Sequence, residues 1–224
     1  MDTRLKKIKK FIEVFDSRRV KRDEKRIEVI GNFIKNFSDF NRISNRPIDC
    51  NMFKLLKLND DEVKNSAILT WLLNPRANYY ENKIFFDAFL KSCGIDLSFD
   101  RIDNYSVRTE FPGMESIVDL LIYKKGTFII YVENKINAQE GIDQCTRELR
   151  DLHRLGNRLK VQMDKQFAIF LTPDGRKPES GDHKHWRTLS YVELSTTFRQ
   201  LIPEIKSEKI RYVLEDWLEI VSNF

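Results

Sequence analysis

Three charged residues interrupt two neighbouring apolar segments of the chain. Asp119 lies within Ile117–Ile122, and Glu133 and Lys135 close the apolar run that begins at Phe128. A carboxylate is costly to bury unless a cation or a hydrogen-bond donor compensates it. Side chains two positions apart on a strand share one face, about 6.6 Å apart along it, so Glu133 and Lys135 should project together. A hairpin formed by the two runs would bring Asp119 within reach of both.

Two carboxylates that converge on one point form an oxygen-rich site for a hard divalent cation. Mg²⁺ in proteins typically binds one or two carboxylates together with water and a substrate phosphate. An ammonium group beside such a site can orient the attacking water or stabilise the charge that develops in a phosphoryl transition state. The alternative is an ion-pair cluster at the end of a sheet. We favour the functional site, because two acids and a lysine within apolar strands are costly without a task.

Strand-forming segments surround these charged residues. Val107–Phe111, Ile117–Tyr123 and Phe128–Lys135 are rich in β-branched and aromatic residues, and Lys124-Lys125-Gly126 is a turn signal between the last two. These two strands should therefore be antiparallel neighbours. A fourth apolar run, Phe167–Thr172, predicts a further buried strand.

Helical periodicity precedes and follows the predicted strands. An N-cap-like cluster at Asn59–Glu62 opens a helix that stops at Asn74-Pro75, and another helix is predicted from about Ile84 to Gly94. Later helices are predicted over about 138–156, 191–205 and 209–222. This order of elements predicts an α/β fold with a central mixed β-sheet flanked by helices.

The N-terminal segment is more basic than the rest of the chain. Residues 1–26 hold 11 Lys and Arg against 5 Asp and Glu, 11 − 5 = +6, which leaves 28 − 29 = −1 for the remainder. Apolar residues recur at helical spacing over 5–15 and 29–37, which predicts two amphipathic helices. Such helices can contact phosphates, anionic lipid or an acidic partner, although charged runs are more often solvated faces. We expect a basic helical N-terminal arm over 1–50 and a separate domain over 51–224.

The arrangement of Asp119 and Glu133-Asn134-Lys135 resembles the active-site signature of the PD-(D/E)XK nuclease superfamily. The segment Val63–Pro75 is similar to one that opens a bacterial branch of that superfamily, usually with His-Ser and Leu-Leu-Asp-Pro. Glu110 and Gln144 also fall where that branch tends to place a Glu and a Gln. Several motifs in one order are much less expected by chance than any one of them.

The resemblance covers about residues 52–172 and implies a restriction-endonuclease-like core, whose catalytic part spans about 105–172. It also implies Mg²⁺-dependent hydrolysis of phosphodiester bonds, with Mn²⁺ as a substitute. Asp119 and Glu133 would be metal ligands, and Lys135 would orient water or stabilise charge. Gln144 would hold Lys135 or a phosphate, or else be an exposed polar residue.

Glu110 has two interpretations of equal weight. It could complete the metal shell from the adjacent strand, or it could be a strand-end carboxylate that pairs with Arg108 or solvent. Two positions depart from the family pattern: Val118 stands where the superfamily has Pro, and Asn65 stands where the branch has His. The first change leaves the metal-binding carboxylate intact, and the second argues against a catalytic role for that helix. Glu62 is best interpreted as an acid in the first turn of a helix, favoured by the helix dipole.

Basic residues follow the predicted site along the next helix. Arg147, Arg150, Arg154 and Arg158 lie on one side of a helical wheel, opposite Cys145, Leu149 and Leu152. Such a ridge could follow a nucleic-acid backbone, or it could be a solvated helix face, and the sequence weighs these equally.

Composition excludes several other classes of protein. The longest clean apolar run, Phe128–Val132, is far shorter than the roughly 20 residues that a membrane span needs. The charged N-terminus lacks an apolar region of secretory type, and the 3 cysteines form no Cys-x-x-Cys pair. We therefore expect a cytoplasmic protein without a membrane partner, a disulfide framework or a zinc site.

Two functional hypotheses follow. The first is an active metal-dependent nuclease, an endonuclease acting on nucleic acid, with DNA favoured, in antiviral defence against phage or in DNA processing. The second is an inactive module of the same fold that binds nucleic acid or a partner protein through its basic N-terminal helices. We favour the first because the three charged residues are intact. A homodimer is a further expectation, since many nucleases cut two strands with paired active sites.

Overall fold

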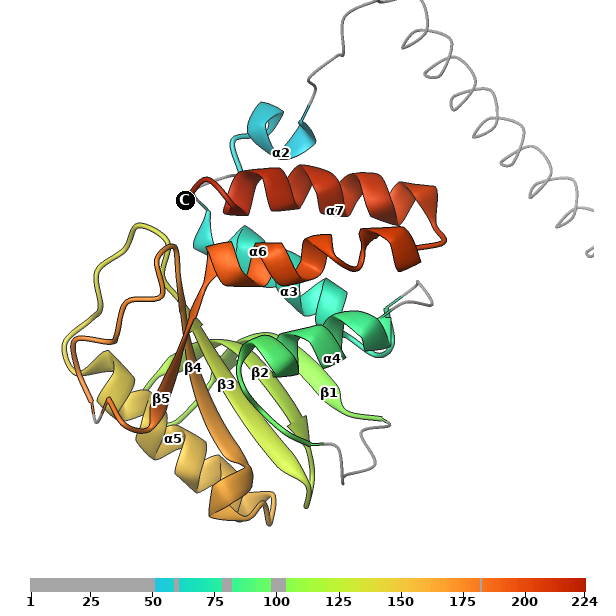
Figure 1. Cartoon of the computed structure of the whole chain (residues 1–224). Coiled ribbons are helices and arrows are strands. Elements are labelled where there is room, and N and C mark those ends of the chain that lie inside the picture. Colours follow the sequence, from blue (N-terminus) through green and yellow to red (C-terminus); the bar gives the residue numbers. More distant parts are fainter. Residues whose placement is uncertain (1–50, 59–60, 78–81, 98–103, 182) are drawn as a thin grey trace, which may run out of the picture. The chain divides into compact units, whose positions relative to one another are not determined.

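The computed structural model describes residues 51–58, 61–77, 82–97, 104–181 and 183–224 (Figure 1). The expected N-terminal arm, including its two amphipathic helices, lies outside the described residues. Among the helices of this described part, none is long and apolar enough to cross a membrane.

A five-stranded mixed sheet forms the centre of the described domain (Figure 1). Its strands lie side by side in chain order: β1 (Ser106–Pro112), β2 (Ile117–Lys124), β3 (Phe128–Asn134), β4 (Gln166–Thr172) and β5 (Trp186–Ser190). The first three strands are antiparallel, whereas β3, β4 and β5 run parallel to one another. The predicted β2–β3 hairpin is confirmed, and Gly126 adopts the positive φ of 71° that its tight turn requires.

Helices cover both faces of the sheet. One face packs against α3 (Glu62–Leu73), α4 (Asn82–Ser92), α6 (Tyr191–Arg199) and α7 (Glu208–Val221), with the short α2 (Met52–Leu55) beside α7. The other face packs against α5 (Gln144–Arg158), the crossover helix between the parallel strands β3 and β4. Because it is covered on both sides, β3 is buried along its whole length.

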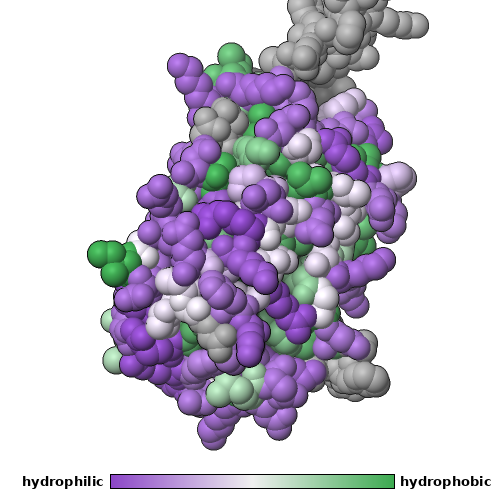
Figure 2. All heavy atoms as spheres, turned by 60° about the vertical axis from the view of Figure 1, so that its left-hand side comes forward, coloured by the Kyte–Doolittle hydropathy of each residue, from purple (hydrophilic) through white to green (hydrophobic). Residues whose placement is uncertain are grey.

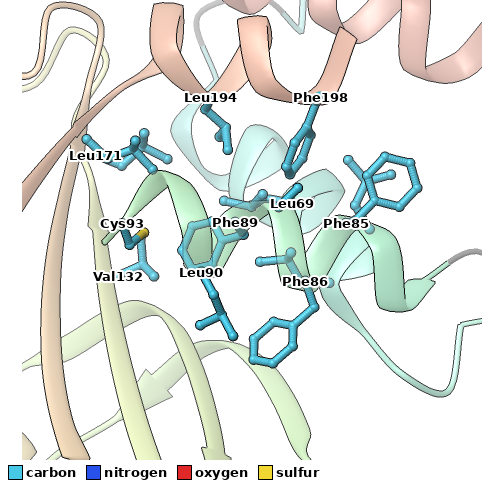
Figure 3. Close-up of a cluster of buried hydrophobic side chains, with 14 of the residues drawn as sticks. Leu69, Phe85, Phe86, Phe89, Leu90, Cys93, Val132, Leu171, Leu194 and Phe198 are labelled. Carbon is cyan, nitrogen blue, oxygen red and sulfur yellow. The ribbon is translucent and has the colours of Figure 1, made fainter. Parts of the chain in front are cut away.

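The larger hydrophobic core lies between the sheet and the helices of the first face. Figure 3 shows Leu69, Phe86 and Phe89 from α3 and α4 meeting Leu194 and Phe198 of α6 over the sheet. These side chains are 0–1% exposed. The outer surface is different: the face in Figure 2 is mostly hydrophilic, with apolar side chains scattered singly. A second, smaller hydrophobic cluster lies between the other face of the sheet and α5.

The predicted α/β class, with a restriction-endonuclease-like mixed sheet flanked by helices, is confirmed. The sequence prediction was wrong in two places. The helix expected from 138 begins only at Gln144, because residues 136–143 form a loop in which Asp143 has a φ of 49°. The edge strand β5 was not predicted, since exposed Arg187 and Thr188 interrupt its short apolar pattern.

Candidate active site

Two carboxylates meet where β2 and β3 leave their shared ladder. Leu120 pairs with Val132, so Asp119 and Glu133 occupy the next opposed positions on the two strands. Asp119 Oδ2 accepts a hydrogen bond of 2.7 Å from the backbone N–H of Asn134. The structure thus brings together the two acids that the hairpin was expected to unite.

Lys135 lies directly beside Glu133 at the carboxyl end of β3. Its Nζ is 2.7 Å from Glu133 Oε1, and the two side chains are 11% and 1% exposed. The Lys135 backbone N–H donates to Leu171 O at 2.9 Å, which holds this end of the chain against β4. All three charged residues singled out in the sequence therefore belong to one largely buried cluster.

Burial dominates the electrostatics of this cluster. Burial, together with repulsion from neighbouring carboxylates, raises the pKa of Asp119 to about 7 and the pKa of Glu133 to about 8. Burial by itself would lower the pKa of Lys135, but attraction by Glu133 and Asp119 raises it overall. The acids consequently hold protons near neutral pH unless additional positive charge compensates them.

Gln144, the first residue of α5, reaches into the cluster. Its Nε2 donates to Glu133 Oε1 and, at 2.9 Å, to Glu148 Oε1, while its Oε1 accepts from the Gly141 backbone N–H at 3.0 Å. The side chain was expected to hold Lys135 or a phosphate, or else to be exposed. Instead it bridges two acids and fixes the orientation of the Glu133 carboxylate.

Glu148 is a member of the site that sequence analysis missed. It is 0% exposed, and its Oε2 has no hydrogen-bond partner within the described residues. Burial raises its pKa to about 7, although the hydrogen bond from Gln144 opposes the shift. The signal that could have found it is its spacing, because Cys145, Glu148 and Leu152 share the buried stripe of α5.

Glu62 supports the loop that follows Lys135. It occupies the first turn of α3, as expected, and its Oε1 also accepts hydrogen bonds from the backbone N–H groups of Ile136, Asn137 and Ala138 at 2.7, 3.2 and 3.1 Å. These contacts join the start of α3 to the end of β3. The position of Lys135 thus depends on an acid more than seventy residues earlier in the sequence.

A family model of the PD-(D/E)XK nuclease superfamily matches residues 50–219, which include all the elements that build this cluster. The chain belongs to this superfamily. The assignment made from Asp119 and Glu133-Asn134-Lys135 is therefore confirmed. No curated protein and no solved structure matches the chain.

Asn65 has a structural role in this PD-(D/E)XK chain. Its Oδ1 accepts a hydrogen bond from Trp217 Nε1 at 2.9 Å, and its Nδ2 donates to Asp61 O at 2.9 Å. The next residue, Ser66, receives a 3.0 Å hydrogen bond from Asn134 Nδ2. The residue in place of the usual His therefore ties α3 to α7.

Glu110 occupies the position on β1 opposite Asp119. Its neighbours Thr109 and Phe111 pair with Leu120 and Val118, but Glu110 itself has a left-handed φ of 46° and an exposed side chain. It forms no hydrogen bond or ion pair with any other described residue, and so does not pair with Arg108. Its role as a third metal ligand stays a prediction.

The arginine ridge of α5 contacts the turn between β1 and β2. Arg150 and Arg154 both form ion pairs with Glu115, while Arg147 donates to the backbone oxygens of Glu115 and Ile142. These guanidinium groups already have partners inside the protein and hold the turn against the helix. Contact between the ridge and a nucleic-acid backbone stays a prediction.

The cluster offers carboxylate oxygens as candidate ligands for a divalent cation. Within the described ranges, no group of three or more His, Cys, Asp or Glu side chains has a ready metal-binding arrangement. However, the buried Oε2 atoms of Glu133 and Glu148 have no donor there except a proton that the two carboxyl groups can share. Hard carboxylate oxygens are the ligands that Mg²⁺ prefers, and an unpartnered buried oxygen is costly without a cation. The residues present therefore fit a divalent ion.

Proposed function

We propose that this protein is a divalent-metal-dependent nuclease that hydrolyses the phosphodiester bonds of DNA. The observation that carries the proposal is the convergence of Asp119, Glu133 and Lys135 at one end of the sheet, with Glu133 Oε2 buried and unpartnered among the described residues. Such an arrangement lowers stability by itself and is explained by a cation and an anionic substrate. Membership in the nuclease superfamily supports the same reaction class.

Asp119 and Glu133 would hold Mg²⁺ or Mn²⁺, and Glu110 is the candidate for a third carboxylate. When bound, the ion supplies a Lewis acid that polarises a phosphate oxygen and lowers the pKa of a coordinated water. The chain's own groups position these components. The Asn134 backbone N–H orients Asp119, and the Gln144 amide orients Glu133.

Lys135 is the group that would act on the reacting phosphate. Its ammonium lies 2.7 Å from Glu133 Oε1, so it can orient a water held at that carboxylate or stabilise negative charge on the phosphoryl oxygens. Attraction by the acids raises its pKa, which keeps it protonated and suits charge stabilisation better than proton abstraction.

The substrate and its context extend the same proposal. We favour DNA, in phage defence or DNA processing, with the basic N-terminal arm and Arg147, Arg150 and Arg154 adding affinity that does not depend on sequence. Pairing of two chains would allow two strands to be cut, and the arm could also hold a partner protein.

Cleavage assays on a panel of substrates test this proposal. Circular, linear, single-stranded and branched DNA and RNA are incubated with Mg²⁺, Mn²⁺ or EDTA. We expect metal-dependent cutting of DNA that Glu133→Gln and Lys135→Met each lower roughly 10²-fold or more. Glu179→Gln changes an exposed acid of the same type and is the matched control. Absence of cutting in every condition, or equal cutting by the site variants, would contradict the proposal.

A further inference from the structure

Three large apolar side chains are exposed beside the acidic cluster. Met114 is 81% exposed in the turn between β1 and β2, Ile117 is 61% exposed at the start of β2, and Ile142 is 88% exposed in the turn before α5. Single exposed apolar side chains are common on protein surfaces, whereas several around one site are typical of an interaction surface. We call these three residues the apolar rim.

The apolar rim adjoins the proposed reaction centre on two sides. Ile117 precedes Asp119 by two positions on β2, so the two side chains share a face of the sheet and are about 6.6 Å apart along the strand. Ile142 precedes Gln144 by two positions, and the Gln144 amide donates to Glu133 Oε1. A phosphodiester held at the two acids would therefore bring its neighbouring sugars and bases against the rim.

Hydrogen bonds hold both turns of the rim in place. The Arg147 guanidinium donates to Glu115 O at 3.2 Å and also to Ile142 O, so one side chain joins the two turns. The backbone N–H groups of Glu115 and Ser116 donate to Asp151 Oδ2 at 2.8 and 3.0 Å. The exposed side chains are thus presented on a fixed backbone, and little freedom of the main chain is lost when a bound molecule covers them.

Turn geometry does not account for the two apolar side chains at the tips. In each turn a glycine comes first, Gly113 or Gly141, and Met114 or Ile142 follows it. Gly, Pro, Asn, Asp and Ser are the residues that favour turns, and the reasons for their preference do not apply to Met or Ile. Packing does not account for these side chains either, because most of their surface is in contact with solvent. Contact with a bound molecule explains both of them better.

The position of the rim favours nucleic acid as the bound molecule. A second copy of the chain seated on these side chains would cover the acids as well and would exclude the substrate. A nucleic acid contacts both features at once, because a phosphodiester at Asp119 and Glu133 places the adjoining bases beside the apolar side chains. We propose that Met114 and Ile142 insert between bases of the DNA next to the cleaved phosphodiester. This inference rests on the proposed nuclease function and deepens it.

Insertion implies a preferred class of substrate. An apolar side chain placed between base steps unstacks them and kinks the duplex, at a cost that burial of the side chain partly offsets. This cost is smallest where the bases are mismatched or already unpaired. The preferred substrate is therefore a duplex that contains a mismatch or an opened step at the cut site.

Fluorescence measurements in EDTA test insertion without cleavage. An adenine analogue that becomes brighter when it is unstacked is placed beside a central mismatch in one duplex and at the same position in a fully paired duplex. Both duplexes are titrated with the full chain. Ile142→Gln and Met114→Gln make the side chains polar and keep them long. Met163→Gln is the matched control, because Met163 is also largely exposed and precedes β4 at the other end of the sheet.

We expect the unaltered chain to bind the mismatched duplex about tenfold more tightly than the paired one and to raise its fluorescence. Ile142→Gln and Met114→Gln should each reduce this preference roughly threefold and lower the rise in fluorescence. Binding of the paired duplex and the midpoint of thermal unfolding should stay unchanged, because both substitutions are at exposed positions. Met163→Gln should behave as the unaltered chain does.

Other results would overturn the inference. Equal binding of the two duplexes by the unaltered chain, or binding of neither, would show that the rim does not favour unstacked bases. A rise in fluorescence that Ile142→Gln and Met114→Gln leave unchanged would show that other groups unstack them. If these variants instead dissociate a dimer in sedimentation experiments, the rim is a contact between copies. Failure of the unaltered chain to cut any DNA in Mg²⁺, with the fluorescence differences retained, would reject the nuclease function and leave insertion standing.

Discussion

Two buried acids on α5, Asp151 and Glu148, differ in how many hydrogen-bond donors surround them. Asp151 is 2% exposed, and its Oδ2 accepts hydrogen bonds from the backbone N–H groups of Glu115 and Ser116 and from the Ser116 hydroxyl, at 2.8, 3.0 and 3.1 Å. Glu148, one turn earlier, is 0% exposed and leaves one carboxylate oxygen without a partner among the described residues. The same helix therefore buries one acid with compensation and another without it.

The difference separates a structural acid from a functional one. Hydrogen bonds from backbone N–H groups stabilise the charge of Asp151, so this carboxylate fastens the β1–β2 turn to the helix. Glu148 adds repulsion to a cluster that already contains Asp119 and Glu133, and the pKa values of all three are raised to about 7 or 8. Folding stability is given up where the chemistry is proposed to take place, as is common at active sites.

Removing the structural acid should have the largest effect on stability. Asp151→Ala leaves two half-buried backbone N–H groups without their acceptor, so we expect the free energy of unfolding to fall by about 3 kcal/mol. Urea unfolding followed by circular dichroism measures this. Glu115→Gln alters the half-buried acid of the same turn but keeps both backbone donors to Asp151; it is the control and should shift the midpoint only slightly. Equal losses in both variants would break the distinction between the two acids.

Neutralising the functional acid, Glu148, should lower cleavage and not stability. Glu148→Gln removes a negative charge that no described residue compensates at Oε2, so stability should be kept or increased. The orientation of Gln144 and Glu133 would change, and we expect DNA cleavage to fall about 10- to 100-fold, as for residues that support metal ligands. Cleavage rates and unfolding midpoints of the same preparation measure the two effects. A large loss of stability without loss of cleavage would show that Glu148 is a structural acid, as Asp151 is.

The sequence predicted the part of the site that depends on local geometry. A hairpin with a short turn fixes its own register, so the approach of Asp119 to Glu133 and Lys135 followed from apolar runs and Lys124-Lys125-Gly126. Glu148 could not be found in this way. A Glu in a helix rich in charge suggests a solvated face, and its burial depends on packing against a sheet formed by distant segments.

Long-range contacts also explain the other differences between the sequence predictions and the structure. Asn65 could be recognised as a departure from the family pattern, but its partner Trp217 lies 152 residues away. The arginine ridge was predicted from its spacing, yet its ion pairs with Glu115 depend on where the β1–β2 turn settles. Strand β5 is short and lies at the sheet edge, so its pattern carries little signal on its own.

The acidic cluster should make the free energy of unfolding fall as pH rises. Acids that are ion-paired in the folded state have the opposite effect. The pKa values of Asp119, Glu133 and Glu148 lie near 7 to 8 in the folded chain but near 4 in an unfolded one. Between these values the folded state binds more protons than the unfolded state, so stability is greatest at the acid end and falls as pH rises. The expected fall is at most about 1.4 kcal/mol per pH unit for each carboxyl that titrates.

Thermal unfolding in EDTA from pH 5 to pH 8 measures this dependence. The midpoint should decrease with pH, and Glu148→Gln should flatten the curve because one titrating acid is removed. Added Mg²⁺ should raise the midpoint more at pH 8 than at pH 5, since a cation binds the ionised carboxylates and competes with protons. Glu179→Gln, which changes an exposed acid outside the cluster, is the control. A midpoint that rises with pH in the unaltered chain would show that the cluster is already compensated.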